Sequence, residues 1–327
     1  IPFIDRIVQV VIEDPSTQWL LFLRGEVEQS GISRDNWDAV IGPDRGLNPD
    51  LAARGIRLHT APSLTTYYVG FNMDDPVVGP NQKLRQALCC AFDAEAWSRY
   101  YNLRMIPANG PIPPGVAGGR AASEPNPYRL DLDRARRLLA EAGYPDGLDP
   151  ATGRRLVLTM ELGSANDPDV RASVDLFASF MEKIGVRIEA SYNNWPTFLD
   201  KLDRRQCQLF RLAWVADYPD AENFLQLFYG PNSSPGPNHT NYRNPEFDRL
   251  YEQIRVMPDS PERTRLYRRM ADLVVEDAPW LCLAYPLAFG LQHGWVKQVK
   301  PHDFGYGNIK YYDLDTRARA AWRSRGR

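Results

Sequence analysis

The segment WVADYPDAENFL, residues 214–225, contains the residues best suited to chemistry. It follows the largely apolar residues 209–213, so we predict a buried strand that delivers Trp214, Asp217 and Tyr218 to its end. Aromatic rings beside one carboxylate suit a ligand that is partly apolar and partly cationic, because a charge pair in a partly dry pocket is worth more than in water. Asp217 is also suited to capping the turn made by Tyr218, Pro219 and Asp220, and this segment alone favours the cap. Both roles stay open from this segment alone.

An enzyme is the rival interpretation of the same carboxylates. Asp217 and Asp220 resemble the acid pair of a glycoside hydrolase, which needs two carboxyl groups about 5 to 10 Å apart. The sequence contains no G-x-S-x-G elbow, P-loop, H-E-x-x-H or strand-linked G-x-G-x-x-G motif. We therefore predict a protein that is not an enzyme, without catalytic residues. A ligand-free sensor or docking module is the third possibility, since such a surface does not need a buried carboxylate.

Composition narrows the class of ligand. The 327 residues include 39 basic and 41 acidic side chains, a formal charge of −2, which does not indicate nucleic-acid binding. Four histidines are scattered and four cysteines lack any C-x-x-C spacing, so we expect neither a metal site nor another cofactor. The longest apolar run, residues 278–291, contains two prolines and is too short to span a bilayer. Arginines crowd the C-terminal end and indicate an anionic surface partner or a solvated, frayed tail: Arg317, Arg319, Arg323, Arg325 and Arg327.

Alternating helical and strand patterns predict an α/β fold. Residues 7–12, 56–60 and 67–71 are short and rich in β-branched or aromatic side chains, as strands are. Residues 170–184 place apolar side chains on one helical face, Gly185 ends that helix, and residues 186–190 then alternate as a strand. Asn244 and Ser260, each followed by proline, are predicted to cap two further helices.

A series of landmarks runs along the chain on both sides of WVADYPD. Those before it are DRIVQVVIEDPSTQWLLFLRGEVE (5–28), YYVGFNM (67–73), KLRQALCCAFD (83–93), NGPIPPG (109–115), DRARRLLAEAGYPDG (133–147) and NNWPTFLDKL (193–202). NYRNPEFDRLYEQ (241–253) and the helix leading to Trp280 follow it. No single landmark is specific, but their order over nearly the whole chain is. This order resembles the C-terminal portion of the family 5 extracellular solute-binding proteins of ABC importers, of the oligopeptide, dipeptide and nickel type.

This resemblance implies a periplasmic-binding-protein-like two-lobed clamp of type II. Residues 1–68 would form part of the first, hinge-connected lobe, residues 69–284 the second, ligand-binding lobe, and residues 285–327 the return to the first lobe with a basic C-terminal tail. Family members are much longer and begin with a secretion signal. We therefore expect this chain to be one complete lobe plus part of the other, partnered by a missing N-terminal part of the same protein.

The resemblance also assigns roles to individual residues. Asp217 matches the aspartate that holds the α-ammonium of a bound peptide in peptide-binding members. The backbone of Ala213 and Val215 matches the strand that hydrogen-bonds the peptide main chain. Trp195 matches a residue that lines side-chain pockets, and Arg211 a basic position that faces a ligand carboxylate in some members. With Trp214 and Tyr218, these residues make up the predicted ligand-binding site.

Each assignment has a structural alternative, and the chain departs from the family in two places. Trp195 equally suits core packing, and Arg211 suits a surface ion pair. Ala213 stands where members often carry glycine, and Leu202 where some carry an arginine, which leaves recognition of a ligand carboxylate open.

The function implied by the resemblance is capture of a peptide or peptide-like solute in an interlobe cleft, followed by delivery to the membrane permease. The expected location is periplasmic or extracellular, with membrane association through the missing N-terminal part or the permease. The same frame serves opines, sugars and metal chelates in other members, so the frame alone does not choose the solute.

Overall fold

A computed structural model describes residues 3–12, 14–42, 44–121, 123–164, 168–299 and 307–325. The chain forms two compact units, a smaller one from Ile1–Ser63 with Leu287–Arg327 and a larger one from Leu64–Pro286. The chain therefore passes between the units twice. The lobe boundaries expected near Tyr68 and Tyr285 lie a few residues inside the larger unit and stay predictions.

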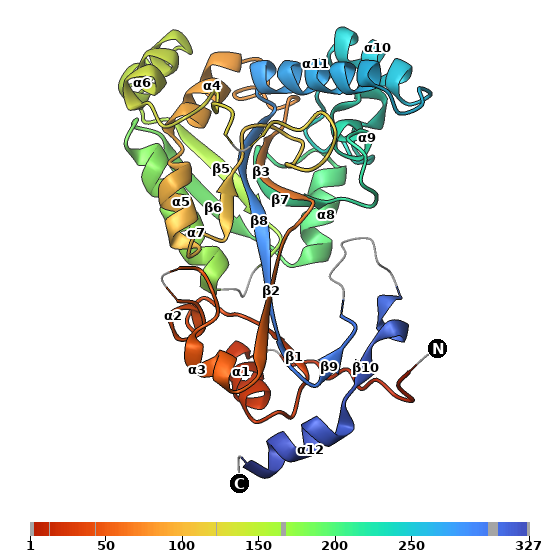
Figure 1. The fold of residues 1–327 in the computed structure, drawn as a ribbon. Helices are drawn as coiled ribbons and strands as arrows, with labels where there is room; N and C mark the ends of the chain where they lie inside the picture. Colours follow the sequence, from red (N-terminus) through yellow and green to blue (C-terminus); the bar gives the residue numbers. More distant parts are fainter. Residues whose placement is uncertain are drawn as a thin grey trace. The chain divides into compact units, whose positions relative to one another are not determined.

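The larger unit is built on a mixed sheet (Figure 1). The first half of β8 (Trp280–His293) pairs antiparallel with β3 (Thr65–Phe71), and β3 pairs antiparallel with β7 (Leu209–Val215). Next come β5 (Val157–Leu162), parallel to β7, and β6 (Arg187–Tyr192), parallel to β5. The short β4 (Met105–Pro107) also pairs with β8. This sheet confirms the predicted α/β class.

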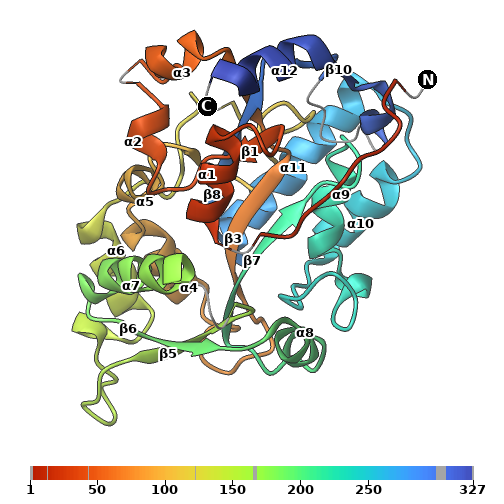
Figure 2. The same ribbon diagram turned by 90° about the horizontal axis from the view of Figure 1, so that it is seen from below.

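Helices cover both faces of this sheet, with α4–α7 on one side and α8–α11 on the other (Figures 1 and 2). The main core lies on the α4–α7 side, where buried side chains of β3, β5 and β8 meet those of the helices. The first side contains α4 (Gln82–Ala91), α5 (Ala94–Tyr100), α6 (Leu132–Glu141) and α7 (Pro168–Glu182). The second contains α8 (Trp195–Asp203), α9 (Glu222–Leu225), α10 (Pro245–Ile254) and α11 (Pro261–Asp277).

Local signals explain where these helices begin and end. The side chains of Asn244 and Ser260 accept backbone N–H bonds at the starts of α10 and α11, which confirms both predicted caps. Gly185 follows α7 with φ +84°, where a Cβ would come within 2.3 Å of the Asp146 carbonyl oxygen. Only glycine fits this position, and the chain turns there into β6 as predicted.

The smaller unit packs a three-stranded antiparallel sheet against short helices. The second half of β8 lies between β1 (Gln29–Gly31) and β2 (Ile56–Pro62). One sheet face forms a core with α1 (Pro15–Leu23), α2 (Trp37–Val40) and α3 (Pro49–Ala53), centred on Phe22, Val40 and Leu291. The unit is completed by β9 (Val296–Lys297), β10 (Asp313–Leu314) and α12 (Thr316–Arg325).

Two expectations for the chain ends were wrong. Residues 7–12 form no strand where the structure describes them, and Val8 and Val11 are exposed, because no described strand lies beside them to complete a ladder. The basic tail is not frayed over its described part. It forms α12, where Arg319 pairs with Glu28 and Arg323 bonds the Gly25 carbonyl. The side chain of Arg325 and all of Arg327 lie outside the described residues.

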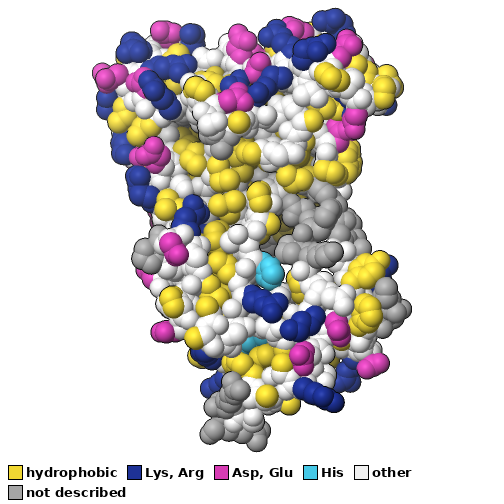
Figure 3. Space-filling view, viewed as in Figure 1, with side chains coloured by type: hydrophobic (Ala, Val, Ile, Leu, Met, Phe, Trp, Pro, Cys, Tyr) yellow, Lys and Arg dark blue, Asp and Glu magenta, His cyan; other side chains and the backbone are white. Residues whose placement is uncertain are grey.

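The surface agrees with the near-zero net charge. Acidic and basic side chains are interspersed over the helices of the larger unit on the face shown in Figure 3. Among the described helices, none combines the length and apolar character needed to cross a membrane.

Candidate functional site

The β7 strand has one edge that is only partly used. β3 pairs with it along its whole length, from Thr65 opposite Val215 to Phe71 opposite Leu209. On the other edge β5 pairs only at Leu209 and Phe210. Within the described part of the chain, residues 212–215 therefore have no second strand beside them. The backbone groups of such an edge are a template for another extended chain.

Asn223 connects the two predicted ligand residues that follow this edge. Its side-chain oxygen accepts from the Trp214 indole N–H at 2.9 Å and from the Asp217 backbone N–H at 3.0 Å. Its amide donates to the Asp217 carboxylate at 3.2 Å. Asn223 is fully buried, Trp214 is half-buried and the Asp217 side chain is exposed. The partly dry pocket expected around Asp217 is thus not formed by the larger unit alone.

The aspartate that caps the turn after β7 is Asp220 rather than Asp217. Asp220 accepts from the Glu222 backbone N–H at 2.9 Å, from the Tyr267 hydroxyl at 2.7 Å and from Arg263 at 2.7 Å. These bonds fix Asp220 as a structural residue and leave Asp217 with Asn223. The glycosidase pair therefore finds no support in the local geometry.

Tyr218 takes part in a separate hydroxyl–carboxylate cluster. Tyr218 and Tyr251 both donate their hydroxyl protons to the Glu222 carboxylate. Burial, and next the bond to Glu222, raises the pKa of Tyr218 to about 12, so the phenol stays protonated at neutral pH. These groups line a cavity of about 380 Å³ together with Tyr229, Asn232 and Arg255.

Arg211, Ala213 and Val215 lie on the opposite face of β7 from Trp214. Side chains alternate along a strand, and Arg211 shares its face with the buried Leu209 and Val69. Arg211 donates to the hydroxyl of Ser173, in the second turn of α7, at 2.7 Å. Ala213 lies opposite Tyr67, and Val215 is exposed. The structure therefore divides the predicted side chains between two faces of one strand.

Trp195 is exposed at the start of α8 rather than packed in the core. The residue is 51% exposed, and its ring packs against that of Phe198 with centroids 5.7 Å apart. The ring also covers Gly163, which directly follows β5, and a Cβ on Gly163 would come within 2.7 Å of it. Trp195 thus lies where β5 ends.

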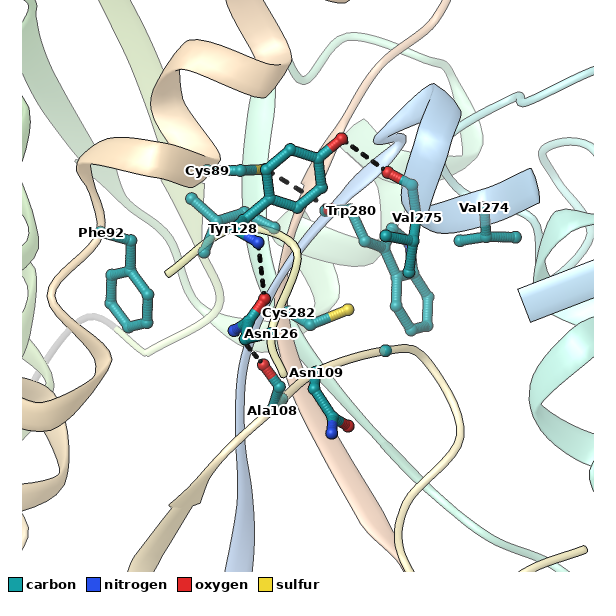
Figure 4. Close-up of a pocket in the computed structure, with 12 residues that line it drawn as sticks. Cys89, Phe92, Ala108, Asn109, Asn126, Tyr128, Val274, Val275, Trp280 and Cys282 are labelled. Carbon is teal, nitrogen blue, oxygen red and sulfur yellow. Dashed lines mark hydrogen bonds between the residues drawn. The ribbon is translucent and has the colours of Figure 1, made fainter. Parts of the chain in front are cut away.

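The cysteines belong to the core. Cys89 and Cys282 line a cavity of only about 20 Å³, near which Tyr128 donates to the Val275 carbonyl at 2.8 Å (Figure 4). This space has room for about one water molecule and is too small for a ligand. Burial raises the pKa of Cys282 to about 12 and that of Cys89 well above its usual value, so both thiols stay protonated and unreactive.

Comparison with known protein families shows to which family the chain belongs. The sequence model of the bacterial extracellular solute-binding proteins, family 5 Middle, matches residues 1–236. This chain belongs to that family.

Curated family 5 relatives agree with this assignment. Heme-binding protein A of Haemophilus influenzae is 26% identical over 308 residues, which cover 93% of this chain and 52% of that protein. The oligopeptide-binding protein OppA of Bacillus subtilis is 26% identical over 279 residues, 84% of this chain and 49% of that protein. The chain thus spans about half the length of the curated relatives it matches.

Solved structures share the fold. The oligopeptide-binding protein AppA of Bacillus subtilis, in complex with a nonapeptide, superposes with a TM-score of 0.76 at 19% identity. That match covers 93% of this chain and 59% of AppA. HbpA2 of Haemophilus parasuis gives a TM-score of 0.74 at 22% identity, covering 96% of this chain and 59% of HbpA2. These matches confirm the predicted type II periplasmic-binding-protein fold, and their coverage agrees with one lobe plus part of another.

Two residues that hold predicted ligand residues in place were not predicted from the sequence. Asn223 lies within the segment at residues 214–225, but no sequence pattern shows that it folds back onto Trp214. Gly163 carries no motif, yet its lack of a side chain makes room for Trp195. A glycine directly after the apolar β5 segment is a sequence signal that another part of the chain packs closely against the backbone there.

Proposed function

We propose that this family 5 chain is the ligand-binding part of a solute-binding protein that captures a peptide or peptide-like solute and delivers it to the membrane permease of an ABC importer. The observation that carries the proposal is the open edge of β7, residues 212–215, which leads directly to Asp217. A peptide pairing with this edge is held through its main chain, which every sequence shares.

Asp217 supplies the charge that the proposed ligand needs. Among the described residues, its carboxylate accepts one bond, from Asn223, and its exposure leaves room for a ligand ammonium. An ammonium at the end of an extended chain is the α-amino group of a peptide. The names of relatives support this class, since they include oligopeptide-binding and di/tripeptide-binding proteins.

The remaining features of the proposal follow from the class of relatives. A solute-binding protein captures and hands over its solute without chemistry, so we propose no catalytic role for Asp217 or Asp220. The permease is the proposed membrane partner, and the proposed location is periplasmic or extracellular, as the family description indicates.

The test is a thermal-shift screen of the complete protein with free-amine peptides of two to nine residues, each beside its N-acetylated twin. Ligands that bind only the folded state raise the melting temperature by mass action. We expect the free-amine peptides to raise it and the acetylated twins to have no effect. Equal shifts would remove the ammonium contact, and no shift with any peptide would overturn the peptide assignment. Hemin is included as a separate probe, because one relative is named a heme-binding protein.

A further inference from the structure

The cavity beside Glu222 has no part in the proposed peptide site. Among the described residues, neither the open edge at 212–215 nor Asp217 lines it. It lies where α9 packs against α10 and α11, at the side of the larger unit (Figure 1). Its volume of about 380 Å³ falls within the range of about 300 to 1,000 Å³ that small-molecule sites occupy. The cavity is therefore large enough for a ligand of its own.

Three tyrosines and one glutamate line this cavity together. Tyr218 and Tyr251 donate their hydroxyl protons to Glu222, and the Tyr229 ring stacks on that of Tyr251 with centroids 4.4 Å apart. Burial, and next the bond to Glu222, raises the pKa of Tyr251 as it does that of Tyr218. Both phenols therefore stay protonated, and the negative charge belongs to the Glu222 carboxylate.

The two arginines that line the cavity are paired with other carboxylates. Arg263 pairs with Asp220 and with Asp259, each at 2.7 Å. Arg255 pairs with the glutamate three residues before it at 3.2 Å. Within the described part of the chain, Glu222 accepts hydroxyl protons but forms no ion pair. The cavity thus keeps a carboxylate without a cation, which attracts a positively charged ligand and repels an anion.

The hydrogen-bonding groups of the cavity are largely in use. Each Glu222 oxygen already accepts a phenol proton, and the Asn232 amide donates to the Gln226 carbonyl at 3.1 Å. A primary ammonium ion or a sugar needs several hydrogen bonds to replace its lost hydration. A quaternary ammonium ion has no N–H groups to satisfy and is attracted by aromatic rings. The cavity therefore favours this class of cation.

We propose that this cavity is a second binding site, which takes a small quaternary ammonium ion through the charge of Glu222 and the rings of Tyr218, Tyr229 and Tyr251. The site goes beyond the proposed peptide function and does not depend on it.

The experiment is calorimetric titration of the complete protein, at constant ionic strength, with choline and with its uncharged isostere, in which carbon replaces the ammonium nitrogen. We expect choline to bind and the isostere not to bind. Glu222→Gln removes the charge and should weaken choline binding by about tenfold or more. Tyr218→Leu removes an exposed ring and should also weaken it, whereas Tyr218→Phe keeps the ring and should bind choline as the parent does.

The matched control is Glu246→Gln, which removes a carboxylate from α10 at a position that does not line the cavity. It should leave choline affinity unchanged, and so should Asp217→Ala, since Asp217 belongs to the peptide site. Ligand-free melting checks the folding of each variant, and the exposed Tyr218 provides a test that does not depend on Glu222→Gln.

Three results would overturn the second site and leave the peptide function standing. They are no binding of choline, equal binding of choline and its isostere, and undiminished choline binding in Glu222→Gln or Tyr218→Leu. Loss of choline binding in Asp217→Ala would place choline in the peptide site and would equally overturn the proposal.

Discussion

Asn223 is the residue on which the geometry of the WVADYPD segment depends. One buried amide satisfies the Trp214 indole, the Asp217 backbone N–H and the Asp217 carboxylate. A buried donor that loses its acceptor costs about 1 to 3 kcal/mol. The side chain therefore contributes to stability and also fixes the direction of the two predicted ligand residues.

Asn223→Ala should lower the free energy of unfolding by about 2 kcal/mol or more, because it leaves two buried or half-buried N–H groups without their acceptor. Urea unfolding followed by circular dichroism measures this. The exposed Gln206→Ala serves as control and should stay within about 0.5 kcal/mol of the parent. If Asn223→Ala leaves the free energy of unfolding unchanged, water replaces the amide and the side chain does not hold the segment.

Asp217→Ala tests the proposed ammonium contact itself. In the complex the ligand ammonium would be left without its counter-charge, at a cost of about 3 to 5 kcal/mol, on the order of a hundredfold to a few thousandfold in affinity. Titration of a free-amine peptide that binds the parent protein measures the change. Asp200→Ala, which breaks only an exposed pair with Arg204, should leave affinity unchanged. Unchanged affinity in Asp217→Ala would remove its proposed role.

At the scale of elements, the sequence pattern predicted those strands, helices and helix caps whose formation depends mainly on local sequence. Strands β2 and β3, the helix at residues 170–184 and the caps of α10 and α11 all formed as expected. Residues 7–12 have strand composition but form none, since a strand also needs a neighbour to complete its hydrogen bonds. The division of Arg211 and Trp214 between two faces follows from strand alternation. The sequence could not show that β5 pairs with β7 only at Leu209 and Phe210, because the extent of strand pairing depends on contacts between distant parts of the chain.

The packing between β5 and α8 leads to a prediction about Gly163. A Cβ there would lie 2.7 Å from the Trp195 ring and 2.8 Å from Phe198, which is fully buried. Gly163→Ala should therefore lower the free energy of unfolding by about 1 to 3 kcal/mol and change the fluorescence of Trp195. Gly31→Ala is the matched control, because open space surrounds its Cβ position. If Gly163→Ala changes neither the free energy of unfolding nor the fluorescence, α8 shifts freely and does not fix Trp195.

At the scale of the whole molecule, the smaller unit carries a buried histidine that makes its stability depend on pH. His293 stacks on Trp295 at 3.9 Å and on Phe22 at 4.3 Å. Its Nε2 lies 2.8 Å from the Phe22 carbonyl oxygen, while its buried Nδ1 has no hydrogen-bond partner among the described residues. Burial lowers the pKa of His293 to about 4, and the nearby Arg54 and Arg323 act in the same direction against the bond to Phe22.

The sign of the effect follows from this lowered pKa. In the unfolded chain His293 binds a proton near pH 6.5, whereas in the folded chain it does so only near pH 4. Its stabilising contribution is complete above about pH 6.5 and is lost as the pH falls to about 4, up to about 3 kcal/mol in all. Urea unfolding at pH 7, 5.5 and 4.5 should show this loss, and His293→Phe should reduce the slope over the same window. Parallel slopes in the parent and in His293→Phe would mean that carboxylates alone cause the acid sensitivity.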